Sequence, residues 1–138
     1  MMTPDAIRLV RDSWAQVEAG RLELAQAFYR HLFTIAPGTR RLFGQIPSAV
    51  LEEKFADMLD EIVRTLDRPY QLMPELTLLG RRHTQYGVTP EDYAPVGDAL
   101  LLALEEKLGT GFNPRVHAAW REAYQMLAHT MVRSAIRG

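Results

Sequence analysis

The stretch LTLLGRRHTQYGV, residues 76–88, is the most informative part of the sequence because it places one histidine on the apolar side of a helix. Leu72, Leu76, Leu79 and His83 are separated by four, three and four residues, so at 3.6 residues per turn they share one face. One ring nitrogen of this histidine can donate to the carbonyl of Leu79, which leaves the other nitrogen for a metal. A core histidine satisfied by a neighbouring side chain or a water is the commoner arrangement, and this helix alone does not decide between the two.

The composition is typical of one globular domain spanning residues 1–138. The chain is 47% hydrophobic and 24% charged, and its formal net charge of -1 gives no electrostatic reason to expect nucleic acid or an anionic membrane as a partner. The absence of cysteine excludes disulfides and thiolate ligands and fits a cytoplasmic protein. The first eight residues contain an acidic residue and no long apolar run, so we expect neither a signal peptide nor a membrane span.

Apolar residues recur at helical spacing along the chain, and capping or turn residues separate the helical segments. The expected helix starts are Thr3, Arg21, Ser48, Pro74, Thr89 and Asn113. The expected breaks are Gly20, Pro37-Gly38, 67–69, Gly87 and 109–111. No segment shows the alternation of a β-strand, and none repeats. The sequence therefore predicts an all-α fold.

Common enzyme motifs are absent: there is no glycine-rich phosphate loop, nucleophile elbow, His-Glu-x-x-His pair or calcium loop. His31, His117 and His129 lie off the apolar stripes among polar neighbours, so we interpret them as solvated residues. A zinc site would need three or four ligands in one place. A metal at His83 must therefore bring most of its own ligands, as the iron of a porphyrin does.

Two tyrosines, Tyr29 and Tyr93, also fall on apolar stripes. A buried phenol costs stability unless its hydroxyl finds a partner, but core packing explains either residue about as well as a function does. The aromatic and methionine side chains of the stripes fit a plain core or the lining of a flat apolar cofactor equally well. Helical periodicity does not distinguish these alternatives.

Three segments together resemble the globin family. They are FYRHLF (28–33) with Pro37 and Leu42-Phe43, LGRRHTQYGV (79–88) followed by YAPVG (93–97), and AWREAY (119–124). The resemblance covers nearly the whole chain, with its parts in the family's order. It is strongest to bacterial single-domain haemoglobins and to the haem domain of flavohaemoglobins.

This resemblance implies a globin fold, with helices packed around a single haem b. It makes His83 the proximal iron ligand and Tyr29 the distal hydrogen-bond donor, with Leu51 and Phe55 as the rest of an unusually apolar distal wall. A shift of one residue in the loop at 44–47 would bring Glu52 to the distal position instead. Phe43 would stack on the ring, and Lys54 and Arg82 would meet the propionates. The full set of implied haem contacts is Phe43, Leu51, Lys54, Phe55, Met58, Leu79, Arg82, His83, Val88, Tyr93, Val96 and Tyr124.

The resemblance further implies reversible binding of dioxygen, carbon monoxide and nitric oxide. An enzymatic alternative is a nitric oxide dioxygenase, which needs electrons; because no flavin or nicotinamide domain precedes Gly138, we expect a separate reductase to supply them. A gas sensor is a third possibility. In flavohaemoglobins a tyrosine and a late glutamate flank the proximal histidine; Tyr93 matches the tyrosine, whereas Ala135 stands at the glutamate position. We therefore expect a histidine that donates less electron density.

Overall fold

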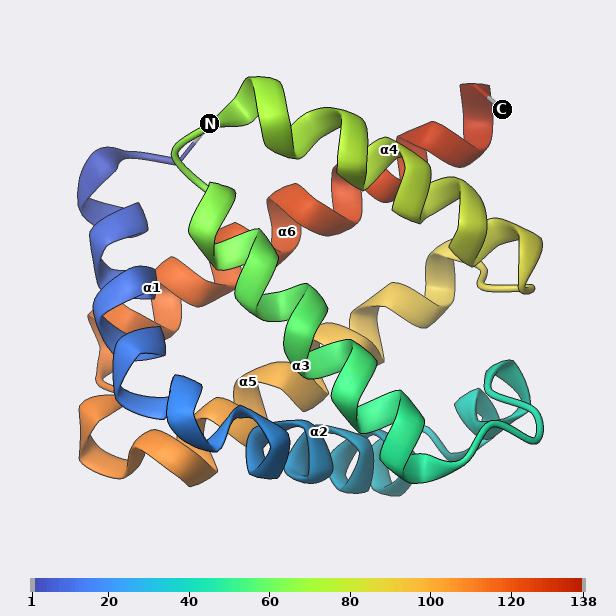
Figure 1. Cartoon of the computed structure of the whole chain (residues 1–138), viewed down its shortest axis with the longest axis horizontal. Coiled ribbons are helices and arrows are strands. Elements are labelled where there is room, and N and C mark those ends of the chain that lie inside the picture. The colour runs from blue at the N-terminus through green and yellow to red at the C-terminus, as the bar shows by residue number, and fades with distance from the viewer. Residues whose placement is uncertain (1, 138) are drawn as a thin grey trace.

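The computed structural model describes residues 2–137, with side chains through residue 134. This part of the chain contains six α-helices and four short 3₁₀ turns (Figure 1). The α-helices are α1 (Pro4–Val17), α2 (Arg21–Ile35), α3 (Ser48–Thr65), α4 (Pro69–Gln85), α5 (Tyr93–Leu108) and α6 (Pro114–Arg137). The 3₁₀ turns are η1 (Glu18–Gly20), η2 (Pro37–Leu42), η3 (Pro90–Asp92) and η4 (Gly109–Gly111). The described residues include no strand, so the all-α prediction is confirmed. None of the described helices is both long and apolar enough to cross a membrane.

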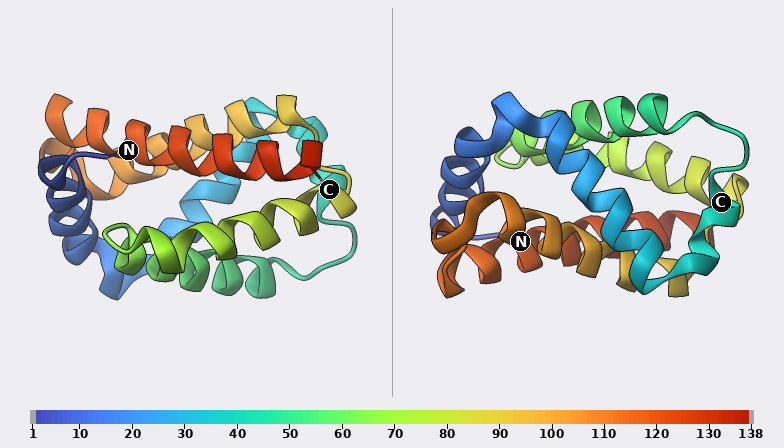
Figure 2. Two further views of the ribbon diagram at one scale, coloured as in Figure 1. Left: turned by 90° about the horizontal axis from the view of Figure 1, so that it is seen from above. Right: turned by 90° about the horizontal axis from the view of Figure 1, so that it is seen from below.

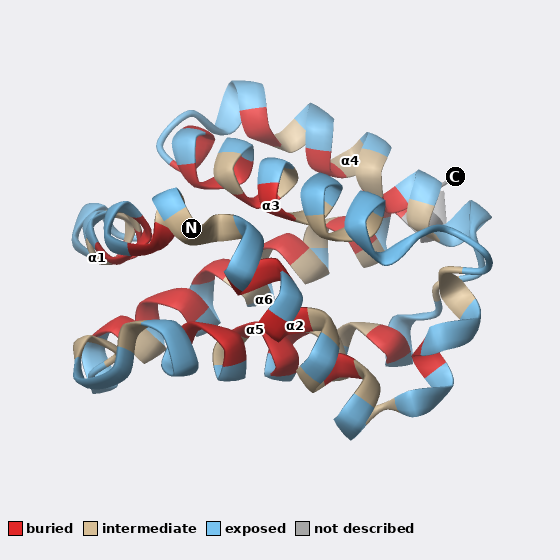
Figure 3. Ribbon diagram, turned by 60° about the horizontal axis from the view of Figure 1, so that its bottom comes forward, coloured by how far each residue is buried: buried red, intermediate tan, exposed pale blue. Residues whose placement is uncertain are grey.

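The helices form two layers. In Figure 2, α3 and α4 lie in one layer, α5 and α6 in the other, α2 runs diagonally between them and α1 closes one end. α2 packs against α5 and α3, and α4 packs against α6. Buried residues line the inward sides of the helices, and exposed residues cover their outward sides (Figure 3).

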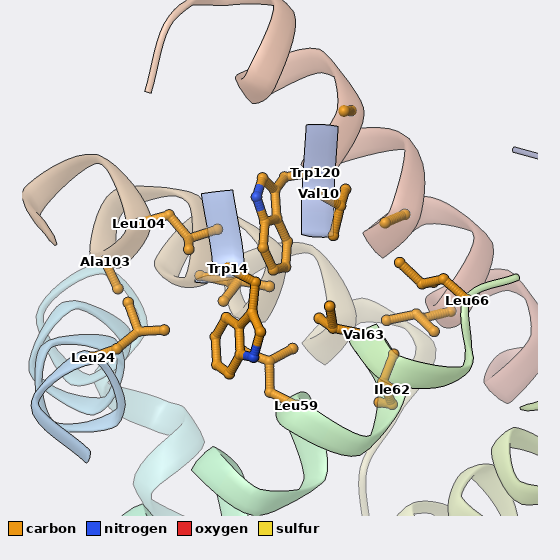
Figure 4. Packing of buried hydrophobic residues seen from close by; sticks show 14 of the residues in the cluster. Val10, Trp14, Leu24, Leu59, Ile62, Val63, Leu66, Ala103, Leu104 and Trp120 are labelled. Carbon is orange, nitrogen blue, oxygen red and sulfur yellow. The ribbon is translucent and has the colours of Figure 1, made fainter. Parts of the chain in front are cut away.

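Two buried tryptophans anchor the core at the α1 end (Figure 4). Trp14 of α1 and Trp120 of α6 have ring centroids 6.2 Å apart. Each indole finds a polar partner: Trp14 donates to Asp60 over 2.8 Å, and Trp120 donates to Ser13 over 2.8 Å. This core fixes α1, α3 and α6 to one another, because a buried indole N–H stays satisfied only if its partner's helix keeps its place.

One predicted helix cap and one predicted helix start are wrong. α3 begins at Ser48, as expected, but Ser48 does not cap it: the residue before the helix is Pro47, and no side chain caps the helix. α4 begins at Pro69, with Pro74 inside it. A proline at position 74 removes only the hydrogen bond to the carbonyl of Tyr70, and since Tyr70 is 97% exposed, water can satisfy that carbonyl.

The helical spacing of the sequence predicts that Leu22, Ala25, Leu32 and Ile35 lie on the inward side of the second helix. Two of them are instead exposed: Leu22 by 43% and Ile35 by 44%. Both lie at the ends of α2, beyond the part that α3 and α5 cover. The middle of the helix follows the prediction, with Ala25 and Leu32 buried. α3 also ends earlier than expected, at Thr65 rather than at 67–69.

Gly80 sets the close approach of α4 to α6. A Cβ added there would lie 2.6 Å from the carbonyl oxygen of Met131 and 2.7 Å from its Cα. These neighbours are backbone atoms of a packed helix, so the clash moves the helices apart. This contact lies one turn before His83, so it also fixes where that side chain stands.

We expect Gly80→Ala to lower the free energy of unfolding by about 1–3 kcal/mol, the usual cost of overpacking. The expected loss appears despite the higher helix propensity of alanine, worth about 1 kcal/mol. Gly38→Ala is the matched control, because a Cβ at Gly38 meets nothing within 4 Å. Urea unfolding of both variants measures the difference; equal stabilities would show that α4 and α6 can separate without cost.

Candidate functional site

His83 lies in the last turn of α4 and is half-buried. Its Nδ1 lies 2.8 Å from the carbonyl oxygen of Leu79, the contact that the helical spacing predicts. A carbonyl can only accept, so Nδ1 carries the proton and Nε2 keeps its lone pair. Burial lowers the pKa of His83 below its ordinary value, and the weaker opposing effect is the hydrogen bond to Leu79, which raises it. At neutral pH the side chain is therefore a neutral imidazole with a free Nε2, the form that binds metals.

Tyr29 lies at the centre of an aromatic cluster formed by Phe28, Tyr29, Phe33, Phe43 and Phe55. Its ring centroid is 5.5 Å from that of Phe43 and 5.8 Å from that of Phe55, both edge to face. Phe28 and Phe55 are stacked at 4.1 Å. The cluster joins α2, α3 and the residue that follows η2, so it brings three of the predicted site residues together.

The Tyr29 hydroxyl is a hydrogen-bond donor with a weak partner. It donates to the carbonyl oxygen of Leu51 over 3.4 Å, which is long for an O–H···O bond. Burial, and after it the negative charge of Glu52, raises the pKa of Tyr29 to about 12. The phenol therefore keeps its proton at any physiological pH and can still donate to a better acceptor.

Tyr93 and Tyr124 form a second pair, where α5 begins and α6 passes over it. The Tyr124 hydroxyl donates to the carbonyl oxygen of Tyr93 over 2.5 Å. Its ring fits against Gly97, where a Cβ would come within 2.5 Å of the ring. The hydroxyl of Tyr93 is buried and has no partner among the described residues. An unsatisfied buried hydroxyl costs about 1–3 kcal/mol, so it indicates a polar group that the polypeptide itself does not supply.

The remaining residues implied by the resemblance divide into two groups. Leu51, Phe55, Met58, Leu79, Val88 and Val96 are half-buried, whereas Lys54 and Arg82 are exposed. No described contact links Lys54 or Arg82 to the others. α3 packs against both α2 and α4, so the tyrosine and histidine ends of the site share one intervening helix. The side chain of Ala135 lies outside the described residues.

The histidines other than His83 do not assemble into a metal site. His31 pairs with Glu106 over 3.0 Å, His117 packs edge to face against Phe112, and His129 is exposed. Within the described side chains, no three His, Asp or Glu residues lie close enough to hold a metal ion. One imidazole, an unsatisfied buried hydroxyl and half-buried aromatic walls fit a haem, whose iron brings four ligands of its own.

A cavity of about 770 Å³ lies elsewhere, at the α1 end. Its walls come from α1, α4, α6 and the segment between α3 and α4, and include Ile7, Met73 and Met126. None of the residues in the candidate site lines it. Sequence reasoning did not predict this cavity, because its residues belong to separate helices and share no motif.

The globin family model matches residues 26–131, which include every residue of the candidate site through Tyr124. The chain belongs to the globin family. The resemblance of the three sequence segments is thereby confirmed, and the family makes this chain a haem protein of the kind that binds diatomic gases.

Individual relatives agree with this placement. A flavohemoprotein of Rhodopirellula baltica is 28% identical over 134 residues, which are 96% of this globin but 33% of the relative. This globin thus spans about a third of the flavohemoproteins that it matches. An uncharacterized globin-like protein of Aquifex aeolicus is 30% identical over 132 residues, covering 96% of this globin and 93% of the relative.

A solved structure has the same fold. It is an engineered carbene transferase, a proposed nitric oxide dioxygenase from Rhodothermus marinus. The two chains superpose with a TM-score of 0.89 at 28% identity, covering 99% of this globin and 95% of the other chain. The predicted globin fold is therefore confirmed.

Proposed function

We propose that this globin is a single domain, residues 1–138, that holds haem b through His83 and reversibly binds dioxygen beside Tyr29. The observation that carries the proposal is the hydrogen bond from His83 Nδ1 to the carbonyl of Leu79 at 2.8 Å. It fixes the tautomer and the ring orientation, and it leaves Nε2 as the ligand. Ferrous haem supplies the gas-binding chemistry, and the chain supplies the ligand and the surroundings.

The proximal side orients the imidazole of His83 but does little to increase its electron density. A backbone carbonyl polarises an imidazole less than a carboxylate does, and no described carboxylate contacts His83. The Tyr93 hydroxyl, buried and unpartnered in the polypeptide, is available for a polar group of the haem or for the histidine. This arrangement favours gas binding over cleavage of an O–O bond.

The distal side offers one donor in apolar surroundings. Tyr29 is held by edge-to-face contacts with Phe43 and Phe55, and the Leu51 carbonyl accepts its weak hydrogen bond. Apolar walls keep competing water away, so the single phenol can donate a hydrogen bond to a bound gas molecule that carries partial negative charge. We propose that Phe43, Leu51, Phe55, Met58, Leu79, Val88, Tyr93, Val96 and Tyr124 contact the ring and that Lys54 and Arg82 pair with the propionates.

The absorption spectrum of the haem-loaded protein tests the proposal. Because Leu51 and Phe55 offer no ligand atom in their side chains, the reduced protein without gas should be five-coordinate and high-spin. Admitting dioxygen should give an oxygenated spectrum that reverts when the solution is purged with argon. A six-coordinate low-spin spectrum without added gas would contradict the apolar distal wall, and immediate oxidation by dioxygen would contradict reversible binding.

A second candidate function is nitric oxide dioxygenation, which the flavohemoprotein relatives and the Rhodothermus marinus structure favour. The same two residues, His83 and Tyr29, would serve it. It requires an electron in each cycle, which we expect a separate reductase to supply. Nitrate counted per haem, after the oxygenated protein meets nitric oxide with a flavin reductase and NADH, separates the two functions: one nitrate per haem fits a binder, and sustained turnover fits the enzyme.

A further inference from the structure

Two segments of this globin carry arginine and no carboxylate. Residues 76–90 and 123–138 contain no aspartate or glutamate, although the chain has 17 of them. The same segments contain Arg81, Arg82, Arg133 and Arg137. In a chain whose net charge is -1, this separation makes one part of the surface locally positive.

The fold places these two segments side by side. Residues 76–85 and 123–137 of these segments form the C-terminal halves of α4 and α6, which run next to each other toward the same end of the molecule (Figure 1). Gly80 of α4 meets Met131 and Ser134 of α6, so Arg81 and Arg133 are sequence neighbours of that contact. Both arginines are exposed.

Most arginines elsewhere in the described chain have an ion-pair partner, with Arg40 and Arg121 as exceptions, whereas the described arginines of this region have none. Among the described side chains, Arg81, Arg82 and Arg133 form no salt bridge. In contrast, Arg30 pairs with Glu106 at 2.6 Å and Arg64 with Asp60 at 2.9 Å. Unpaired cations remain available to the carboxylates of another molecule.

Exposed apolar side chains accompany these charges. Leu78 is 51% exposed, and Tyr86, directly after α4, is 72% exposed. Leu78 and Arg81 are three residues apart and so share one outward face of α4, while His83 faces inward on the opposite side. An aromatic or apolar centre with a charged rim is the usual composition of a protein interface. We call Leu78, Arg81, Tyr86 and Arg133 the cationic face.

We propose that the cationic face docks the acidic surface of a separate flavoprotein that reduces this globin. The proposal rests on the proposed function, since a gas-binding haem must be returned to the ferrous state after it oxidises. One electron leaves the reduced flavin and reduces the ferric iron, so the flavin is oxidised by one electron. A donor docked here is separated from His83 by the width of one helix, about 10 Å.

Charge determines which partner fits. Positive potential attracts a protein with a negative surface and speeds its association at low ionic strength, and salt screens this attraction beyond about 10 Å at 0.1 M. We therefore expect binding of an acidic flavoprotein that weakens steeply as salt is added. Nucleic acid is the competing polyanion, and it serves as a control in the test.

The test uses the haem-loaded globin and a bacterial flavodoxin, an acidic FMN protein, as the probe. Binding of oxidised flavodoxin is measured by titration at low and high salt, without any electron transfer. The double variant Arg81→Glu with Arg133→Glu should weaken binding by about tenfold or more, as expected for two reversed surface charges. Arg81→Gln, which removes the charge without reversing it, should have a smaller effect in the same direction.

Arg121→Glu is the matched control. Arg121 is also an exposed arginine of α6 without an ion pair among the described residues, but it lies near the opposite end of that helix. Its reversal should change binding by less than about twofold if the effect is local rather than a net-charge effect. Two results would overturn the proposal. One is that Arg121→Glu weakens flavodoxin binding as much as the double variant does, and the other is that double-stranded DNA binds as tightly as flavodoxin.

The rate of reduction gives a second readout. Reduction of the ferric protein by reduced flavodoxin should slow in the double variant by the same factor as binding, while reduction by dithionite should not change. Failure of the docking proposal and of the proposed function are separable. A wild-type globin that binds dioxygen reversibly but whose flavodoxin affinity is insensitive to Arg81 would overturn only the docking. Arg81-dependent binding by a globin that does not hold dioxygen would overturn only the function.

Discussion

Replacement of His83 by alanine should remove stable haem binding. His83 is the only histidine that lies in the candidate site, and the structure describes no other imidazole that could take its place. Loss of a group that merely supports a metal ligand lowers affinity by 10- to 100-fold, so loss of the ligand itself should lower it by about 100-fold or more. Haem content per chain after gel filtration measures the effect, with His129→Ala, which changes an exposed histidine, as the control.

A glycine variant separates ligation from folding. His83→Gly leaves space at the end of α4, so added imidazole can enter and restore both the haem content and the spectrum. Restoration would show that the imidazole acts as a ligand. Full haem content with an unchanged ferrous spectrum in either variant, without imidazole, would show that another residue binds the iron.

The pH dependence of haem retention follows from the lowered pKa of His83. In the unfolded chain the imidazole gains its proton near its ordinary pKa of 6.5, whereas burial keeps it neutral to lower pH in the folded protein. This group therefore contributes stability above pH 6.5, which is lost as the pH falls from 6.5 toward the folded-state pKa. Haem should accordingly be retained at pH 6.5 and released only under more acidic conditions.

Helix starts were predictable from the sequence where the capping chemistry is local. The hydroxyl of Thr3 accepts from the N–H of Ala6 at 3.1 Å, the Asp92 carboxylate accepts from the N–H of Thr89 at 2.8 Å, and the Asn113 side chain accepts from the N–H of Val116 at 3.0 Å. Each bond joins residues three apart, so the sequence contains both partners.

The start of α4 was not predictable in this way. Pro69 and Pro74 both suit a first helical turn, and what decides between them is whether the segment between them packs. Leu72 is 1% exposed, and its neighbour Met73 meets Thr130 of α6, so α4 is already packed before Pro74. That contact involves residues more than fifty positions away, and no local pattern encodes it.

In the candidate site, too, some features follow from local sequence spacing and others depend on how distant helices pack. The inward orientation of Tyr29 and His83 follows from helical spacing, and so does the bond from His83 to Leu79. The contact of Tyr29 with Leu51 depends on how α2 crosses α3, and the bond from Tyr124 to the Tyr93 carbonyl depends on how α6 lies against α5. Local spacing likewise does not show that the Tyr93 hydroxyl is left without a partner among the described residues. Gly97, which admits the Tyr124 ring, carries no sequence signal apart from being a glycine inside a helix.

Replacement of Tyr29 by phenylalanine should change the binding of dioxygen far more than that of carbon monoxide. Dioxygen held at ferrous haem has partial negative charge on its outer atom, whereas carbon monoxide stays nearly apolar. The Tyr29 hydroxyl stays protonated, because burial raises its pKa to about 12, and its present partner is a carbonyl 3.4 Å away. The Tyr29 hydroxyl can therefore give up this long hydrogen bond and donate to a charged acceptor at little cost in free energy.

Donation to a charged acceptor contributes about 1.5–3 kcal/mol, which is a factor of roughly 10 to 150 in a dissociation constant. Tyr29→Phe keeps the ring and its edge-to-face contacts with Phe43 and Phe55, and removes only the hydroxyl. We therefore expect dioxygen release to become at least about tenfold faster, the lower end of that range, while carbon monoxide release changes much less.

Stopped-flow displacement of each gas from the ferrous protein measures both rates under one condition. Tyr70→Phe is the control, because Tyr70 is 97% exposed and loses a hydroxyl that touches only solvent. If Tyr29→Phe speeds the release of both gases equally, Tyr29 acts through packing of the aromatic cluster. If it leaves dioxygen release unchanged, the hydroxyl continues to donate to the Leu51 carbonyl and does not turn toward the gas, and the distal role assigned to Tyr29 is then wrong.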